Sequence, residues 1–186
     1  MGENQNKRKI NFSWVQACWI VIAINLLCGA IFAFVSHDMD LVALAEPLGF
    51  VMLLAGIINI FVCFCKSRII HGSRWLIADG LTAILLSLFP LFNQMILPVM
   101  IPLFFGAWEL FSGILKVLDS TELKTEKIEC WIGFAFIGFV ELLSGTLSMV
   151  KPIDDLVGIN TVIATIFLVQ SCGFFLKATM YKYLIK

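Results

Sequence analysis

Residues 131–152 have the sequence WIGFAFIGFVELLSGTLSMVKP, and this stretch decides what kind of fold the chain adopts. Before its last two residues it holds one ionisable side chain, Glu141. A helix needs about 20 mostly apolar residues to cross the hydrocarbon core of a bilayer, so the stretch predicts a transmembrane helix over residues 130–150. Gly138 and Gly145 are about two helical turns apart and therefore share one face of that helix.

The rest of the chain has the same character. Of its 186 residues, 60% are hydrophobic and 14% are charged, and the mean hydropathy is +0.97. Soluble domains are nearer half apolar and a quarter charged, so the composition indicates a membrane protein. We expect an all-α integral membrane fold in a single membrane domain, residues 1–186, with six spanning helices: 13–35, 41–64, 75–93, 95–117, 130–150 and 157–179. The first is too long for a cleavable signal peptide and is expected to remain in place.

Positive charges predict the orientation. Under six crossings, one side of the membrane receives 12 of the 13 Lys and Arg residues, and only Lys151 lies on the other side. Cytoplasmic loops carry an excess of Lys and Arg, so both termini are expected to be cytoplasmic. Trp14, Trp75 and Trp131 open the odd-numbered helices on that same side, at the headgroup level that amphipathic rings favour.

Small residues recur in every helix at comparable depth. Membrane helices lack a hydrophobic drive to associate, and small residues let their backbones approach closely. The expected helix-packing positions are Gly29, Gly49, Gly56, Ala83, Gly106, Gly113, Gly138, Gly145 and Gly173. Their recurrence divides the chain into three two-helix repeats, residues 13–66, 74–120 and 130–182, although the same glycine faces would serve a homo-oligomer as well as internal packing. Only Asn93 and Gln94 separate the third and fourth helices, which predicts a tight hairpin there.

Polar side chains at membrane depth are the candidate functional residues. Asn25, Asp79 and Glu141 each precede a small residue by four positions in an odd-numbered helix, and we expect them to be equivalent in the three repeats. Glu109 lies near the middle of the fourth helix. No lysine or arginine is expected at a depth that would neutralise the three acids. Ionisable groups inside a membrane are costly, which makes these acids candidates for function.

Two interpretations of these acids remain open. In the first interpretation, the three acids line a protonatable path or cavity together with Asn25, Asn59 and Gln170. Alternatively, each is protonated or hydrogen-bonded to a neighbouring helix and holds the bundle together, which we favour because such bonds already account for polar residues beside small ones. A continuous polar cavity would support transport, and a sealed, dry core would support the structural role.

Enzymatic functions find little support in the sequence. It contains no Ser/His/Asp set, no glycine-rich phosphate loop and no metal-ligand spacing, so no catalytic residue, metal site or cofactor is predicted. Cys63 and Cys65 are two residues apart and point to different faces of a helix, which makes them a poor metal pair. The mixed charges of residues 118–129 are expected to form a solvated connection. The predicted partner is the lipid bilayer, with a second copy or another membrane protein possible and no nucleic acid.

The motif of Gly138, Gly145 and Pro152, each seven residues apart, resembles the HdeD-like acid-resistance membrane protein family. That family carries a glycine pair around an apolar, Trp-containing stretch in the next helix, and this chain has such a stretch at Gly106, Trp108 and Gly113. Size, six helices and three hairpins match over nearly the whole chain.

The sequence departs from the family pattern at Ala83 and Ile166, where glycine is usual, and after Gly29, where no proline follows. The resemblance implies a bacterial inner-membrane protein associated with acid stress, and it brings no catalytic or binding residues. We therefore expect a multipass, non-enzymatic protein of acid or envelope stress resistance. The alternative is a small proton-coupled transporter or channel that uses the intramembrane carboxyls.

Overall fold

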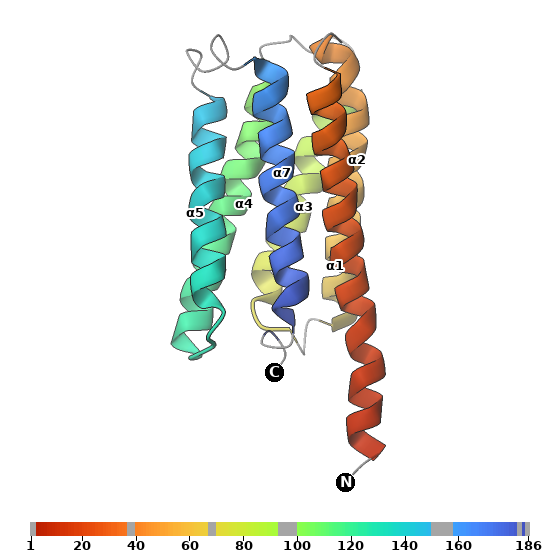
Figure 1. Ribbon diagram of the computed structural model, residues 1–186, viewed down its shortest axis with the longest axis vertical. Coiled ribbons are helices and arrows are strands. Elements are labelled where there is room, and N and C mark those ends of the chain that lie inside the picture. The colour runs from red at the N-terminus through yellow and green to blue at the C-terminus, as the bar shows by residue number, and fades with distance from the viewer. Residues whose placement is uncertain are drawn as a thin grey trace.

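The computed structural model describes residues 3–36, 40–66, 70–92, 100–149, 158–181 and 184. These residues form six helices, α1 (Glu3–Val35), α2 (Leu41–Lys66), α3 (Ser73–Phe92), α4 (Met100–Thr125), α5 (Trp131–Ser148) and α7 (Ile159–Thr179). All six are long and apolar enough to cross a membrane. They run side by side as one bundle, with both chain ends at the bottom in Figure 1. The predicted all-α fold with six spanning helices is confirmed.

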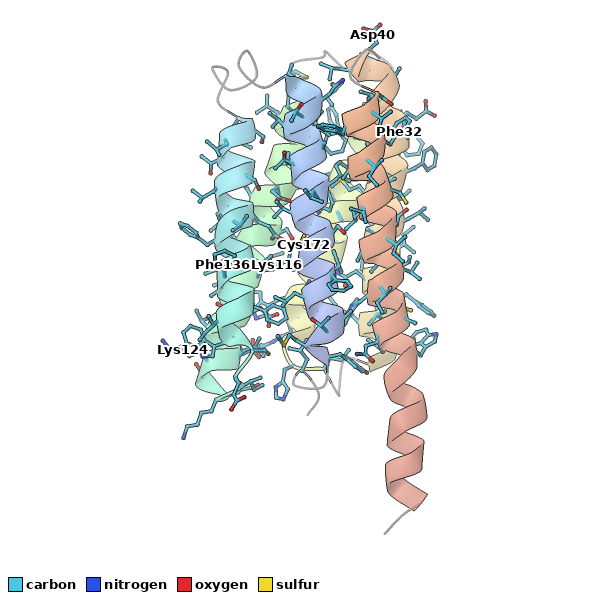
Figure 2. The ribbon with its side chains drawn as sticks, viewed as in Figure 1. Phe32, Asp40, Lys116, Lys124, Phe136 and Cys172 are labelled. Atoms are coloured by element: carbon cyan, nitrogen blue, oxygen red, sulfur yellow. The ribbon has the colours of Figure 1, made fainter. Side chains whose placement is uncertain are left out.

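The outer surface of the bundle is apolar. Large side chains such as Phe64, Phe92 and Phe136 are more than 60% exposed, and Figure 2 shows Phe136 pointing away from α5. In water such a surface would drive aggregation, whereas in a bilayer it meets lipid chains of the same polarity. An apolar outer surface of this kind is typical of helices that span a membrane.

Two helices extend further than expected. α1 begins at Glu3 rather than near residue 13. α4 continues to Thr125 instead of ending at residue 117, and its predicted start near residue 95 lies outside the described residues. The extension of α4 follows from its inward face, because Asp119, Ser120 and Leu123 are buried against the bundle. The expected turn at Asn93 and Gln94 lies outside the described residues.

The helices form a closed ring. Packing is most extensive between α2 and α3, between α4 and α5, and between α1 and α7, while α1–α2, α3–α4 and α5–α7 are in looser contact. The first and last helices of the chain therefore lie side by side, as Figure 1 shows. The tightest packing joins one predicted hairpin to the next, not the two helices within a hairpin.

Glycine pairs explain two of these tight contacts. A Cβ on Gly56 of α2 would lie 2.8 Å from the carbonyl oxygen of Gly80 in α3. A Cβ on Gly113 of α4 would lie 2.9 Å from the carbonyl oxygen of Gly138 in α5. Real Cβ atoms do not approach this closely, so the backbones touch only because both positions lack a side chain.

The other predicted packing positions also face neighbouring helices. Ala83 of α3 faces Gly56 of α2, because a Cβ on Gly56 would lie 3.1 Å from the Cβ of Ala83. The remaining positions contact side chains or backbone of the next helix: Gly29 faces Val51 and Phe167, Gly49 faces Pro90 and Leu91, Gly106 faces Ser148, Gly145 faces Leu110, and Gly173 faces Glu141 and Lys116.

The paired glycines also fix which residues of the repeats correspond. Because Gly80 and Gly138 make the same contact, Glu141 of α5 corresponds to Ala83 of α3. Asp79 lies one helical turn nearer the start of its helix. The expected equivalence of Asp79 and Glu141 is therefore wrong, since close backbone contact and not the position of the acid sets the register of the helices.

Candidate functional site

Polar side chains from four helices meet inside the bundle. All are buried, and we call them the charge cluster: Asp79 of α3, Ser112 and Lys116 of α4, Glu141 of α5, and Gln170 and Lys177 of α7. Figure 2 shows Lys116 within the bundle, between α5 and α7 in that view. Ser112 and Lys116 are four residues apart and so project from the same face of α4.

Lys116 is the centre of the cluster. Its Nζ donates to Glu141 Oε1 at 2.5 Å, to Ser112 Oγ at 2.7 Å and to Gln170 Oε1 at 3.2 Å. These are the three donor positions of one ammonium group, shared among three helices. A buried charge is tolerated only when it is paired and hydrogen-bonded, and Lys116 meets both conditions.

Asp79 connects the cluster to α2 and α7. Its Oδ1 accepts a hydrogen bond from Ser112 Oγ at 2.8 Å, and its Oδ2 lies 3.5 Å from Lys177 Nζ. Asn59 of α2 donates to the same carboxyl at 3.4 Å. The ammonium of Lys177 also lies over the ring of Phe174, 4.6 Å from its centroid, a geometry that favours a cation.

Two further carboxyls flank the cluster on α4. Glu109 is fully buried, and its Oε1 accepts from Ser144 at 2.8 Å. Asp119, only 5% exposed, lies about one turn beyond Lys116 toward the end of the bundle that carries both chain termini. Glu109 Oε2 and Asp119 Oδ1 have no hydrogen-bond partner among the residues that the structure describes. The buried polar region thus contains four carboxyls and two ammonium groups.

Two small recesses adjoin Asp79. One, of about 180 Å³, lies between α3, α4 and α7 and is lined by Trp75, Leu76, Asp79, Leu115, Lys116, Asp119 and Lys177. It has room for about one water molecule. The other, of about 170 Å³, lies between α2, α3, α4 and α7, and it is too tight for water.

Aromatic side chains fill the bundle on the side of Glu109 that faces away from the charge cluster. Phe167 of α7 packs edge-to-face against Phe105 and Trp108 of α4. Its ring centroid lies 5.3 Å from that of Phe105 and 5.6 Å from that of Trp108. All three are at most 1% exposed. The polar recess therefore adjoins the half of the bundle near the termini, and the other half is packed with apolar rings.

The end of the bundle near the termini is covered by polar contacts. The Trp75 indole donates to Glu122 Oε2 at 2.7 Å, and His71 pairs with Glu126. The backbone N–H of His71 donates to the carbonyl oxygen of Leu184 at 2.8 Å, which fastens the C-terminal segment over this end. Gly72 has φ +69°, and its backbone lies directly against the Asp119 carboxyl.

Two segments of the chain, residues 20–92 and 78–150, match the family model described as a short repeat of unknown function (DUF308). The chain belongs to the DUF308 family. The first match begins in α1 and the second in α3, so the DUF308 unit recurs with a step of two helices, which confirms the predicted internal repeat. No match was found among the curated proteins or among the solved structures.

In this DUF308 protein, the expectation that no lysine or arginine lies at the depth of the acids is wrong. Lys116 and Lys177 are 3% and 2% exposed and point into the bundle. They had been counted among the cytoplasmic charges because they stand near the ends of apolar segments. α4 continues well past Lys116, however, and the long side chain of Lys177 extends from the last turn of α7 into the core.

The expectation that residues 118–129 form a solvated connection is wrong in its first half. α4 continues to Thr125, and Asp119 faces the bundle interior. Within this segment Leu118 and Thr121 are exposed on the outer face of α4, and most side chains from Lys124 to Glu129 are exposed as well. The charge pattern alone could not separate one inward carboxyl from its outward neighbours.

The structure brings most of the predicted polar residues together. Asp79, Glu141 and Gln170 are in the charge cluster, and Glu109 flanks it. Asn25 is elsewhere, since its side chain donates to the backbone oxygen of Val51 at 2.8 Å and joins α1 to α2.

Sequence reasoning missed Ser112, Lys116, Asp119 and Lys177. A signal for three of them was present, because Glu109, Ser112, Lys116 and Asp119 recur every three to four residues and form a polar stripe along one face of α4. Lys177 had no such signal of its own.

Metal chemistry has no supporting geometry in the part of the DUF308 chain that the structure describes, where no group of three or more His, Cys, Asp or Glu side chains is placed to hold an ion. Cys63 is buried and Cys65 is exposed, so the two thiols face different ways. The chemistry available to the buried residues is hydrogen bonding, ion pairing and the exchange of protons.

Proposed function

We propose that this chain is a non-enzymatic, multipass protein of the bacterial inner membrane that contributes to acid or envelope stress resistance, and that its charge cluster and the two flanking carboxyls, Glu109 and Asp119, are the part that binds protons. The observation that carries the proposal is the imbalance of four buried carboxyls, Asp79, Glu109, Asp119 and Glu141, against two buried lysines. The resemblance to the HdeD-like family supports the link to acid stress.

The imbalance implies bound protons. An uncompensated charge in a low-dielectric core costs several kcal/mol, so a core of this kind does not hold two unpaired carboxylates. Asp79 and Glu141 each lie beside a lysine. Glu109 and Asp119 form no salt bridge with either lysine among the described residues. They are therefore the carboxyls that carry the protons in this arrangement.

Acidification would act on the remaining two carboxyls. A proton added to Asp79 or Glu141 removes the negative charge that faces Lys177 or Lys116, and it leaves that ammonium without its counter-ion inside the membrane. The contacts that join α3, α4, α5 and α7 would then rearrange. Such a rearrangement gives a proton-dependent change of state without any enzymatic step.

A second candidate function is proton-coupled passage of a small solute or ion. It is favoured by the recess between α3, α4 and α7, which places polar groups beside a space large enough for water. It is opposed by the apolar packing of Phe105, Trp108 and Phe167 on the other side of Glu109. The sealed half of the bundle makes the first candidate the better supported one.

Under the predicted orientation, with both termini in the cytoplasm, the recess would lie on the cytoplasmic side. The cluster would then respond to acidification of the cytoplasm. The apolar outer surface supports a lipid bilayer as the main partner, and nothing in the site calls for nucleic acid.

The deciding experiment compares acid survival of cells that depend on this protein. We expect the Glu109→Gln/Glu141→Gln double variant to survive acid shock less well than wild type at equal protein levels in the membrane, because it has lost two of the four proton-binding carboxyls. Glu129→Gln, which removes an exposed carboxyl, is the matched control and should behave as wild type. Equal survival of all three strains would contradict the acid-stress function. A proton flux in proteoliposomes that the double variant abolishes would favour the second candidate.

A further inference from the structure

Asp119 lies between the charge cluster and the end of the bundle near the termini. Its side chain is 5% exposed, its Oδ1 has no hydrogen-bond partner among the described residues, and it lines the recess that Asp79, Lys116 and Lys177 also line. A buried polar atom without a partner costs free energy comparable to a lost hydrogen bond. The unpartnered Oδ1 is the carboxyl oxygen nearest Gly72, and the recess that the same residue lines is about large enough for one water molecule beside the carboxyl group.

Charged and titratable groups face Asp119 from each neighbouring element. Lys177 of α7, Asp79 of α3, and Lys116 and Glu122 of α4 interact with it electrostatically, as does Cys130 at the start of α5. On the outer side, the loop before α3 lies against it at Gly72, a position without a side chain. Asp119 is thus the carboxyl of the buried region that lies next to the covering loop.

We propose that Asp119 is the entry group through which the charge cluster exchanges protons with water on the side of the membrane that holds the termini, and that the recess holds one water molecule which connects Asp119 to Asp79. This inference rests on the proposed function, because it assumes that the cluster binds protons. It adds the route and the residue that controls the rate.

Asp119, which carries a proton in this arrangement, gives that proton to the recess water while the water gives one of its own protons to Asp79, so the water is unchanged. The Asp119 carboxylate that remains then takes up a proton from bulk water. The net result is one proton moved from bulk water to Asp79. The Asp79 carboxyl is then neutral, and its ion pair with Lys177 is lost.

The route has one open end. Beyond Glu109, the packed rings of Phe105, Trp108 and Phe167 fill the space between α4 and α7 with apolar side chains. The cluster therefore exchanges protons with the side of the termini and not with the other side. A proton store that equilibrates with one compartment is a sensor of the pH in that compartment and does not dissipate a gradient.

The test is a rapid pH drop on purified, full-length protein in detergent, with a soluble pH indicator that reports proton uptake. The amplitude reports how many protons the protein binds, and the rate reports how they enter. We expect Asp119→Asn to slow uptake by about tenfold or more, as loss of a positioned proton-transfer group does, and to lower the amplitude by no more than its own proton. Asp119→Glu should restore the rate, and Glu129→Gln should match wild type.

A second variant covers the case in which Asp119→Asn does not fold. Leu115→Phe places apolar bulk in the recess without changing a carboxyl, and it should slow uptake at full amplitude because it displaces the water. An unchanged rate in folded Asp119→Asn, or in Leu115→Phe, overturns this inference and leaves the proposed function intact. Absence of uptake in wild type overturns the proposed function and this inference with it.

Discussion

Lys116 Nζ lies 2.5 Å from Glu141 Oε1, so α4 and α5 are joined by an ion pair inside the membrane-spanning part of the bundle. A third helix makes the space for it. A Cβ on Gly173 of α7 would lie 3.0 Å from Glu141 Oε1 and 3.1 Å from Lys116 Cε. The pair therefore depends on a glycine that the sequence pattern had suggested only as a helix-packing position.

Breaking this pair from either side should be costly. Glu141→Gln leaves the Lys116 ammonium without its carboxylate, and Lys116→Met leaves the carboxylate without its ammonium. Loss of one partner of a buried pair costs about 3–5 kcal/mol of unfolding free energy. The double variant should lose less than the sum of the two single losses, because neither charge remains. Denaturant unfolding in detergent micelles measures all three, and additive losses would contradict the pairing.

Glycine at position 138 should be required for the contact between α4 and α5. In Gly138→Ala, the new Cβ would lie 3.0 Å from the Gly113 carbonyl oxygen and from the Val117 backbone nitrogen, neither of which can move easily. We expect a loss of about 1–3 kcal/mol, as overpacking typically causes. Gly133→Ala on the same helix is the matched control, since its Cβ would meet only the flexible end of Leu176 at 3.2 Å. Equal losses in thermal unfolding would mean that the glycine contact is not what the two helices require.

The loop before α3 allows strain and contact to be separated. Gly72 and Gly158 both have positive φ, +69° and +78°, so alanine at either position should cost about 1–2 kcal/mol of conformational strain. A Cβ on Gly72 would also collide with the Asp119 carboxyl, whereas one on Gly158 would meet nothing within 4 Å. Gly72→Ala should therefore lower the unfolding temperature more than Gly158→Ala does. A larger effect at Gly158 would contradict the described position of Asp119.

Both chain ends should be cytoplasmic. Although Lys116 and Lys177 are buried and cannot contribute to orientation, the other Lys and Arg residues still lie almost entirely on the side of the termini. A C-terminal fusion to a reporter that is fluorescent only in the cytoplasm should be bright, and a fusion to a reporter that is active only outside should be silent. The reverse pattern would also move the recess to the other side of the membrane.

Cys130, just before α5, should react slowly with maleimide. Burial raises the pKa of the Cys130 thiol above its ordinary value, which lowers the fraction of reactive thiolate. In a chain that keeps only this cysteine, labelling near neutral pH should be at least about tenfold slower than at a cysteine introduced by Glu129→Cys, an exposed neighbour. Denaturation should make the two rates equal. Fast labelling of native Cys130 would show that this end of α5 is open to water.

The fold was predictable from the sequence to the level of six spanning helices, because hydropathy over about 20 residues depends on composition and not on partners. Glu109, Asp79 and Glu141 were also identifiable as buried acids from their depth alone. Their counter-ions were not. Whether Lys116 turns inward depends on where α4 ends, and whether Lys177 does depends on the position of Asp79 in another helix. Contacts between distant segments are set by tertiary packing, which a local pattern does not contain.

The register between the repeats failed for a related reason. Asp79 and Glu141 are both acids that stand four residues before a small residue, and that likeness suggested equivalence. The backbone contact at Gly80 and Gly138 shows that they occupy different turns. A comparison of side-chain types along one chain cannot distinguish a shared position from a shared residue type, whereas a shared contact can.

The contact between α1 and α7 has a consequence for how the protein is made. α7 emerges from the ribosome after the other described helices, supplies Lys177 and Gln170, and closes the ring against α1. Before α7 is inserted, Asp79 lacks Lys177 and Lys116 lacks Gln170. α1 also lacks the helix with which it makes its most extensive contact. The core is therefore complete only after α7 has been inserted. A nascent chain stopped before Ile159 would be an open arc of helices that the insertion machinery or a chaperone has to hold.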